Sequence, residues 1–167
     1  MSLISWYREN ISSTILILVH GEEWTMMVKK FFMPMIPPTC TYQEKQVRVV
    51  NGKPVFYEPA ELVAARQKLR DYLGQYRMSQ PLEGAVRLTT WWCFPRGKHH
   101  DGEYRISRPD TDNLVKMLKD VMTELRFWKD DAQVASEVIE KYWAEIPGIY
   151  IKLETVSGNQ DEGRTSP

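Results

Sequence analysis

The stretch RPDTDNLVKMLKDVMTELRFWKDDAQV, residues 108–134, carries the strongest structural pattern in this chain. Apolar residues follow Leu114 at spacings of 4, 7, 8 and 11, the pattern of one face of an amphipathic helix. Asp110 or Asp112 is expected to begin this helix, because aspartate is favoured at helix N-termini. A polar turn at 129–131 follows. The stretch therefore predicts a helix with carboxylates at its start and again just after its end.

The sequence on either side of this stretch predicts strands and one further helix. Residues 85–94 (AVRLTTWWCF) are β-branched and aromatic, which is typical of a central, buried strand. Pro59 is expected to begin a second helix. Asn51-Gly52 is expected to form a turn after a strand or extended loop at 41–50. Further strands are expected at 28–36, 134–143 and 149–153. The fold class is α+β, a small mixed sheet of about four to five strands with two main helices.

One domain is expected, because 167 residues of which 43% are apolar suffice for a single core. The domain is placed at 28–155, an N-terminal extension without an assigned role at 1–27, and a disordered tail at 156–167. Cys40 and Cys93 are far apart and lack CxxC spacing. This excludes a disulfide framework and a cysteine-based zinc site, and it fits a reducing cytoplasm.

No membrane segment is expected. The only apolar run near the start, at 11–19, is much shorter than the roughly 20 residues that cross a bilayer. It also lacks the basic flank and small-residue cleavage site of a signal peptide. A cytoplasmic location is the expectation that follows.

Carboxylates occupy three positions near the predicted helix: Asp110, Asp112 and the pair Asp130-Asp131. The helix is about 20 Å long, so these groups meet only if the turn and the following strand fold back along it. Two carboxylates about 4 Å apart repel by about 4 kcal/mol at an effective dielectric of 20. A fold that gathers three of them needs a cation, and hard Mg²⁺ prefers such oxygen ligands.

Each of these residues also has a simpler interpretation. Aspartate at a helix start is an N-cap in most proteins, and Asp-Asp before a strand is commonly a solvated turn. A calcium loop starting at Asp110 is excluded, because valines stand where that loop needs glycine and glutamate. Lys116, four residues after Asp112, either forms an ordinary ion pair with it or serves as a cation that holds a scissile phosphate. Asn113 either orients a carboxylate or caps the helix.

The net charge of zero conceals an uneven distribution of charge. Between Val28 and Val156, 20 lysines and arginines face 17 aspartates and glutamates, a balance of +3 that becomes +7 without the four acids above. The loop before the helix carries two histidines and four cations: Arg96, Lys98, Arg105 and Arg108. These cations are either phosphate-backbone contacts or part of a solvated surface loop.

The acidic pattern resembles the signature of the RusA-type crossover junction endodeoxyribonucleases, the RusA-type Holliday junction resolvases. That family carries Asp-x-Asp-Asn-Leu-x-Lys at a helix start and Trp-x-Asp-Asp-x-Gln-Val about one helix later. The matching residues are Asp110, Asp112, Asn113, Leu114 and Lys116, then Trp128, Asp130, Asp131, Gln133 and Val134. Both halves and their spacing are intact over 25 residues.

The resemblance implies metal ligation by Asp110, Asp112 and Asp131, with Lys116 essential to cleavage. Asp130 and Asn113 are supporting candidates. It implies Mg²⁺, for which Mn²⁺ substitutes, and a bacterial or phage-encoded enzyme of DNA recombination and repair. It also implies a homodimer that presents two active sites to a four-way DNA junction and hydrolyses two phosphodiesters symmetrically.

Three other functions fit parts of the pattern. A nuclease acting on flaps or replication forks would use the same metal site. A non-catalytic DNA-binding homologue would keep the fold, although the intact acidic residues and Lys116 argue against it. A small interaction domain would use its aspartates only as caps. Labelled junction, flap, fork and linear DNA, with and without Mg²⁺, distinguish these functions.

Overall fold

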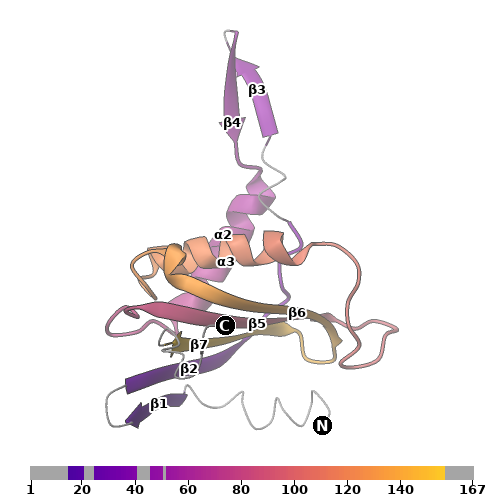
Figure 1. The fold of residues 1–167 in the computed structure, drawn as a ribbon. Helices are drawn as coiled ribbons and strands as arrows, with labels where there is room; N and C mark the ends of the chain where they lie inside the picture. The colour runs from indigo at the N-terminus through magenta and orange to yellow at the C-terminus, as the bar shows by residue number, and fades with distance from the viewer. Residues whose placement is uncertain (1–14, 21–24, 41–45, 51, 157–167) are drawn as a thin grey trace, which may run out of the picture.

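A five-stranded mixed sheet forms the body of the domain in the computed structural model, which describes residues 15–20, 25–40, 46–50 and 52–156 (Figure 1). Its strands are β1 (Ile15–His20), β2 (Thr25–Pro34), β5 (Ala85–Pro95), β6 (Val134–Ala144) and β7 (Gly148–Val156). The strand order is β1-β2-β7-β5-β6. Only β5 and β6 run parallel, and the other neighbours are antiparallel. The predicted small mixed sheet is therefore confirmed.

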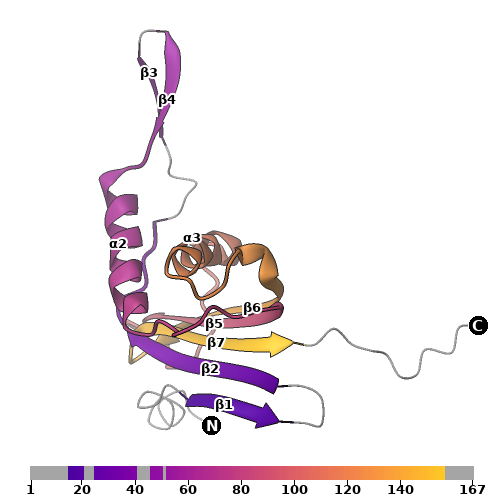
Figure 2. The same cartoon turned by 90° about the vertical axis from the view of Figure 1, so that its left-hand side faces the viewer.

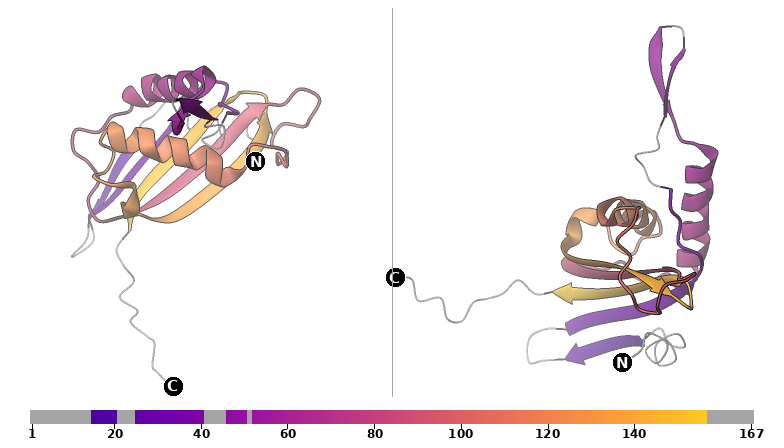
Figure 3. Two further views of the ribbon diagram at one scale, coloured as in Figure 1. Left: turned by 90° about the horizontal axis from the view of Figure 1, so that it is seen from above. Right: turned by 90° about the vertical axis from the view of Figure 1, so that its right-hand side faces the viewer.

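Two helices, α2 (Ala60–Gly74) and α3 (Thr111–Glu124), lie on the same face of this sheet (Figure 3). α3 connects β5 to β6, because parallel strands require a crossover and a helix commonly supplies it. The predicted apolar stripe of α3 is buried from Leu114 to Leu125 against the sheet and α2. Trp92 of β5 is fully buried between the layers, as the aromatic composition of that central strand predicts. No helix in the described part of the chain is long and apolar enough to cross a membrane.

The structure differs from the sequence-based expectation at the N-terminal side. β2 begins at Thr25 rather than at residue 28, and β1, within the expected extension, pairs with it along the sheet edge. The strand or loop expected at 41–50 includes β3 (Gln46–Val50), which pairs with an unexpected strand, β4 (Lys53–Tyr57). This hairpin projects beyond the sheet and helices (Figure 2). Val156, the first residue of the tail expected at 156–167, is the last residue of β7, and residues 157–167, like residues 1–14, lie outside the described residues.

Candidate active site

The start of α3 carries Asp110 and Asp112. Asp110 immediately precedes the helix with φ −74° and ψ 152°, and its side chain makes no capping hydrogen bond. Asp112 lies in the first turn and is exposed. The ammonium of Lys141, on β6, fixes the approach to the helix by donating to the carbonyls of Ser107 at 2.9 Å and Pro109 at 2.7 Å. The Asp110 carboxylate is thus not used as a helix cap, and its oxygens are available to a cation.

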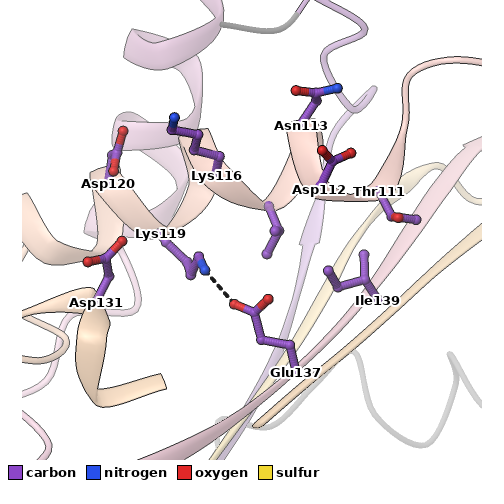
Figure 4. Close-up of a pocket in the computed structure, with 10 residues that line it drawn as sticks. Thr111, Asp112, Asn113, Lys116, Lys119, Asp120, Asp131, Glu137 and Ile139 are labelled. Carbon is purple, nitrogen blue, oxygen red and sulfur yellow. Dashed lines mark ion pairs between the residues drawn. The ribbon is translucent and has the colours of Figure 1, made fainter. Parts of the chain in front are cut away.

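A cleft of about 600 Å³ runs along α3, beside β6 and the short 3-10 helix η2 (Asp131–Gln133). Four of the residues predicted from sequence line it: Asp112, Asn113, Lys116 and Asp131 (Figure 4). Asp110 is not among the lining residues. The remaining lining residues are Thr111, Val115, Lys119, Asp120, Glu137 and Ile139.

Asp112 and Asp131 lie at opposite ends of this cleft (Figure 4). Asp112 is in the first turn of α3, whereas Asp131 follows the end of the helix, whose 14 residues span about 21 Å. Asp120, about 12 Å along the helix axis from Asp112, shares the Asp131 end. Among the described residues, no three Asp, Glu, His or Cys side chains lie close enough to hold one ion. The expected ligands Asp110, Asp112 and Asp131 therefore do not converge within one chain.

Asp112 and Asp131 lie apart because of the crossover connection between β5 and β6. The strand that follows α3 does fold back beneath the helix, as the sequence-based interpretation required, and it brings Glu137 and Ile139 into the cleft. Asp131, however, precedes that strand. A helix that joins two parallel strands starts at one end of the sheet and finishes at the other, so residues flanking it are separated by its length.

The neighbouring residues Asp130 and Asp131 have different surroundings. The Asp130 carboxylate accepts a hydrogen bond from the backbone N–H of Ala132 at 2.8 Å, and the Gln133 side chain accepts one from the N–H of Asp130 at 3.3 Å. The Gln133 amide also donates to two carbonyls before β5, both at 3.0 Å. This reciprocal capping holds η2 in place. Asp130 therefore fixes the turn, while Asp131 faces the cleft.

Sequence reasoning missed an ion pair across the cleft. Lys119 of α3 and Glu137 of β6 form an ion pair at 2.6 Å, drawn as the dashed line in Figure 4. The pair ties the middle of the helix to the strand below it. Lys119 and Asp120 follow Asp112 by seven and eight residues, so helical spacing could have predicted that all three lie on the same side of α3. The position of Glu137 could not have been predicted in this way, because it depends on the pairing of β6 with β5.

The family model for "Endodeoxyribonuclease RusA" matches residues 35–154, which include both helices, the hairpin and the whole cleft. The chain belongs to the RusA family. Its class is therefore that of an endodeoxyribonuclease, a hydrolase of DNA phosphodiester bonds.

Two relatives are similar to parts of this chain. The crossover junction endodeoxyribonuclease RusA of Lactococcus phage r1t is 33% identical over 97 residues, which cover 56% of this chain and 72% of the relative. The uncharacterized protein YqaN of Bacillus subtilis (strain 168) is 28% identical over 119 residues, covering 64% of this chain and 83% of the relative. The RusA-type resemblance inferred from the acidic pattern is confirmed by these matches.

The start of α3 in this RusA-family chain offers donors of the type that Mg²⁺ prefers. Asp110, Asp112 and Asn113 lie within four consecutive residues there, and Asp112 and Asn113 line the cleft. Mg²⁺ usually keeps several waters and takes one or two protein carboxylates, with substrate phosphate oxygens completing its octahedron. Such a site fits the residues present. A site made by three aspartates of one chain does not.

The cations of the basic loop before α3 have different surroundings in the structure. The Arg105 guanidinium lies 3.9 Å from the ring centre of Phe94 and 4.6 Å from that of Trp143, and it donates to the Arg108 carbonyl at 2.5 Å. Burial lowers the pKa of Arg105 from its usual range. Lys98 is exposed in a turn near the start of the loop. The Arg105 guanidinium therefore holds the loop in place, whereas the Lys98 side chain is exposed to solvent.

Proposed function

We propose that the protein is a Mg²⁺-dependent Holliday junction resolvase that cuts two opposed DNA strands as a homodimer. The observation that carries the proposal is the acidic cleft along α3, in a chain that matches the RusA family over residues 35–154. The phage r1t relative is named a crossover junction endodeoxyribonuclease, which supports the choice of branched DNA as substrate. A role in recombination and repair in the cytoplasm of a bacterium follows from that substrate.

In the proposed reaction, the oxygen of a water molecule bonds to the phosphorus of a DNA phosphodiester and the bond to the 3′-oxygen breaks, which leaves a 5′-phosphate and, after the 3′-oxygen takes up a proton, a 3′-hydroxyl. Mg²⁺, when bound, would supply Lewis-acid chemistry. Asp110 and Asp112 would hold the ion at the start of α3. Lys116, exposed one helical turn after Asp112, donates to a phosphate oxygen as negative charge develops. The Lys119–Glu137 pair keeps α3 at a fixed height above β6, which fixes where these groups lie.

A second copy of the chain would complete the site. One chain places Asp131 at the far end of α3 from Asp112. If two copies pack with their α3 helices antiparallel about a twofold axis, the partner's Asp131 approaches Asp112, and the reverse holds at the second site. Twofold dimers are the commonest soluble oligomers, and such an axis makes the two sites identical. Two sites are also what two opposed cuts in a four-way junction require.

The proposal is tested by incubating the protein with end-labelled four-way, flap, fork and linear DNA of matched sequence, with Mg²⁺, Mn²⁺ or EDTA. We expect cleavage of the four-way junction in either metal and none in EDTA. Faster cleavage of flaps or forks than of the junction would instead favour the flap- or fork-specific nuclease. Binding without cleavage in both metals would indicate a non-catalytic homologue.

Substitutions at Lys98 and Arg105 should separate DNA contact from loop stability. Lys98→Ala is expected to weaken binding to every DNA shape and to reduce the slope of log affinity against log salt by about one unit, because one phosphate contact is lost. Arg105→Ala is expected to lower the free energy of unfolding by about 2 kcal/mol, since a partly buried cation loses two ring contacts and its hydrogen bonds. Fluorescence anisotropy at several salt concentrations and urea unfolding measure the two effects. An unchanged salt slope for Lys98→Ala would show that this residue does not touch phosphate.

A further inference from the structure

The loop that leads into α3 carries an isoleucine that is exposed to solvent. Ile106 is 97% exposed, the largest exposed fraction among the large apolar side chains of the described residues. Tyr104, two positions earlier, is 61% exposed. A fully solvated isoleucine gains nothing from the fold, so its apolar surface is available to a ligand.

The backbone on both sides of Ile106 is held firmly. The N–H of Arg105 donates to the Lys141 carbonyl at 2.9 Å, and the Lys141 ammonium donates back to the Ser107 carbonyl at 2.9 Å. The Arg105 guanidinium is packed on Phe94 and bonded to the Ser107 hydroxyl at 3.0 Å. The loop therefore presents Ile106 from a fixed position, and little conformational entropy is lost when a ligand meets it.

Ile106 lies close in the chain to Asp110, and so to the DNA that the proposed metal site would bind. Ile106 precedes Asp110 by four residues, so its Cα lies within about 14 Å of the Cα of Asp110, the reach of an extended chain. Arg108, between them, is exposed, and Lys98 is exposed on the same loop. An apolar tip among cations that face solvent is complementary to a stacked base flanked by phosphates.

We infer that Ile106 is a wedge that enters the DNA at the branch point and separates the bases next to the scissile phosphate. The inference rests on the proposed function, because it takes branched DNA as the ligand. Apolar side chains inserted between base steps unstack them in other DNA-binding proteins. A branch point is where the insertion costs least, since stacking is already interrupted there. One face of the Tyr104 ring stacks on Tyr142, with 4.9 Å between the ring centres, and the ring is 61% exposed, so a displaced base can stack on its outer face. Ile106 thus acts as a positioning residue that favours branched over linear DNA.

The test uses the full-length protein and a four-way junction that carries 2-aminopurine at the nucleotides flanking the branch point, in EDTA so that the DNA stays intact. The fluorescence of 2-aminopurine rises when the base leaves its stack, and the anisotropy of a distant label reports binding separately. We expect a rise for the wild type. For Ile106→Ala we expect about tenfold weaker binding and loss of most of the rise at saturating protein. Ile106→Leu, which keeps an apolar tip of the same size, should restore the rise.

Val138→Ala is the matched control, because Val138 is also an exposed aliphatic residue, at 43%, but lies on β6 outside the set that lines the cleft. It should behave as the wild type in both signals. A full rise for saturated Ile106→Ala, or a change in its molecular mass by light scattering, would overturn the wedge; the latter would assign Ile106 to a contact between copies. Wild-type protein that cleaves junctions without any rise would also overturn the wedge alone. Wild-type protein that binds no branched DNA would overturn the proposed function as well.

Discussion

We expect Asp112→Asn to slow junction cleavage by on the order of a thousandfold, which corresponds to about 4 kcal/mol of transition-state stabilisation. Asparagine has nearly the same shape as aspartate, and position 112 is exposed in the first turn of α3, so the fold should be retained. The substitution removes one negative charge from the proposed Mg²⁺ site. It also removes a charge that repels the DNA backbone, so junction binding should be unchanged or tighter.

Single-turnover cleavage of a labelled junction in Mg²⁺ measures the first effect, and anisotropy in EDTA measures the second. Asp71→Asn is a suitable control, because Asp71 is an exposed aspartate on α2 that is not among the residues lining the cleft. It should cleave at the wild-type rate. An Asp112→Asn variant with near wild-type activity would refute the assignment of the metal site to the start of α3.

Mixing two inactive variants should restore activity. Asp131→Asn is expected to lose cleavage as Asp112→Asn does. When the two are unfolded together and refolded in equal amounts, about half of the dimers contain one copy of each. In such a dimer, one site carries both substitutions, while the other combines an unaltered Asp112 with the partner's unaltered Asp131. We therefore expect about a quarter of the wild-type number of complete sites, and products that are nicked once rather than cut in pairs.

Asp130→Asn provides the matched control for Asp131→Asn. Asparagine caps a helix as well as aspartate does, so the capping of η2 should survive and cleavage should remain within about twofold of wild type. A mixture of Asp112→Asn and Asp131→Asn that stays inactive would contradict a site shared between two copies. It would require the two aspartates to act within one chain, through a movement of α3 relative to η2.

Local sequence patterns predicted the elements that position the site. α3 could be predicted because its apolar residues repeat with the helical period and aspartates mark its start. β5 was predictable because residues 85–94 are rich in β-branched and aromatic side chains, which is typical of a buried strand. The chemistry of the site, a group of carboxylates beside a lysine, could also be predicted, since it depends on which residue types occur together.

What the sequence did not predict depends on contacts between distant segments. Most of β1 lies within the apolar run at 11–19, which was considered only as a membrane segment or a signal peptide, and β4 has only five residues, one of them a proline. Their assignment as strands depends on the strands they pair with. The separation of Asp112 from Asp131 follows from the parallel pairing of β6 with β5, which no spacing along the chain encodes. Arg105 was grouped with the other loop cations because its packing against Phe94 and Trp143 depends on where β5 and β6 lie. Residue type was thus predictable, and residue role depended on topology.

Cleavage of a supercoiled plasmid with an extruded cruciform tests the account most directly. A dimer with two sites cuts both opposed strands within the lifetime of one complex, so linear plasmid should appear as the first product in Mg²⁺. In EDTA, neither linear nor nicked plasmid should appear. Accumulation of nicked circles alone, with the enzyme in excess over plasmid, would contradict paired cutting and indicate a nuclease that cuts one strand at a time.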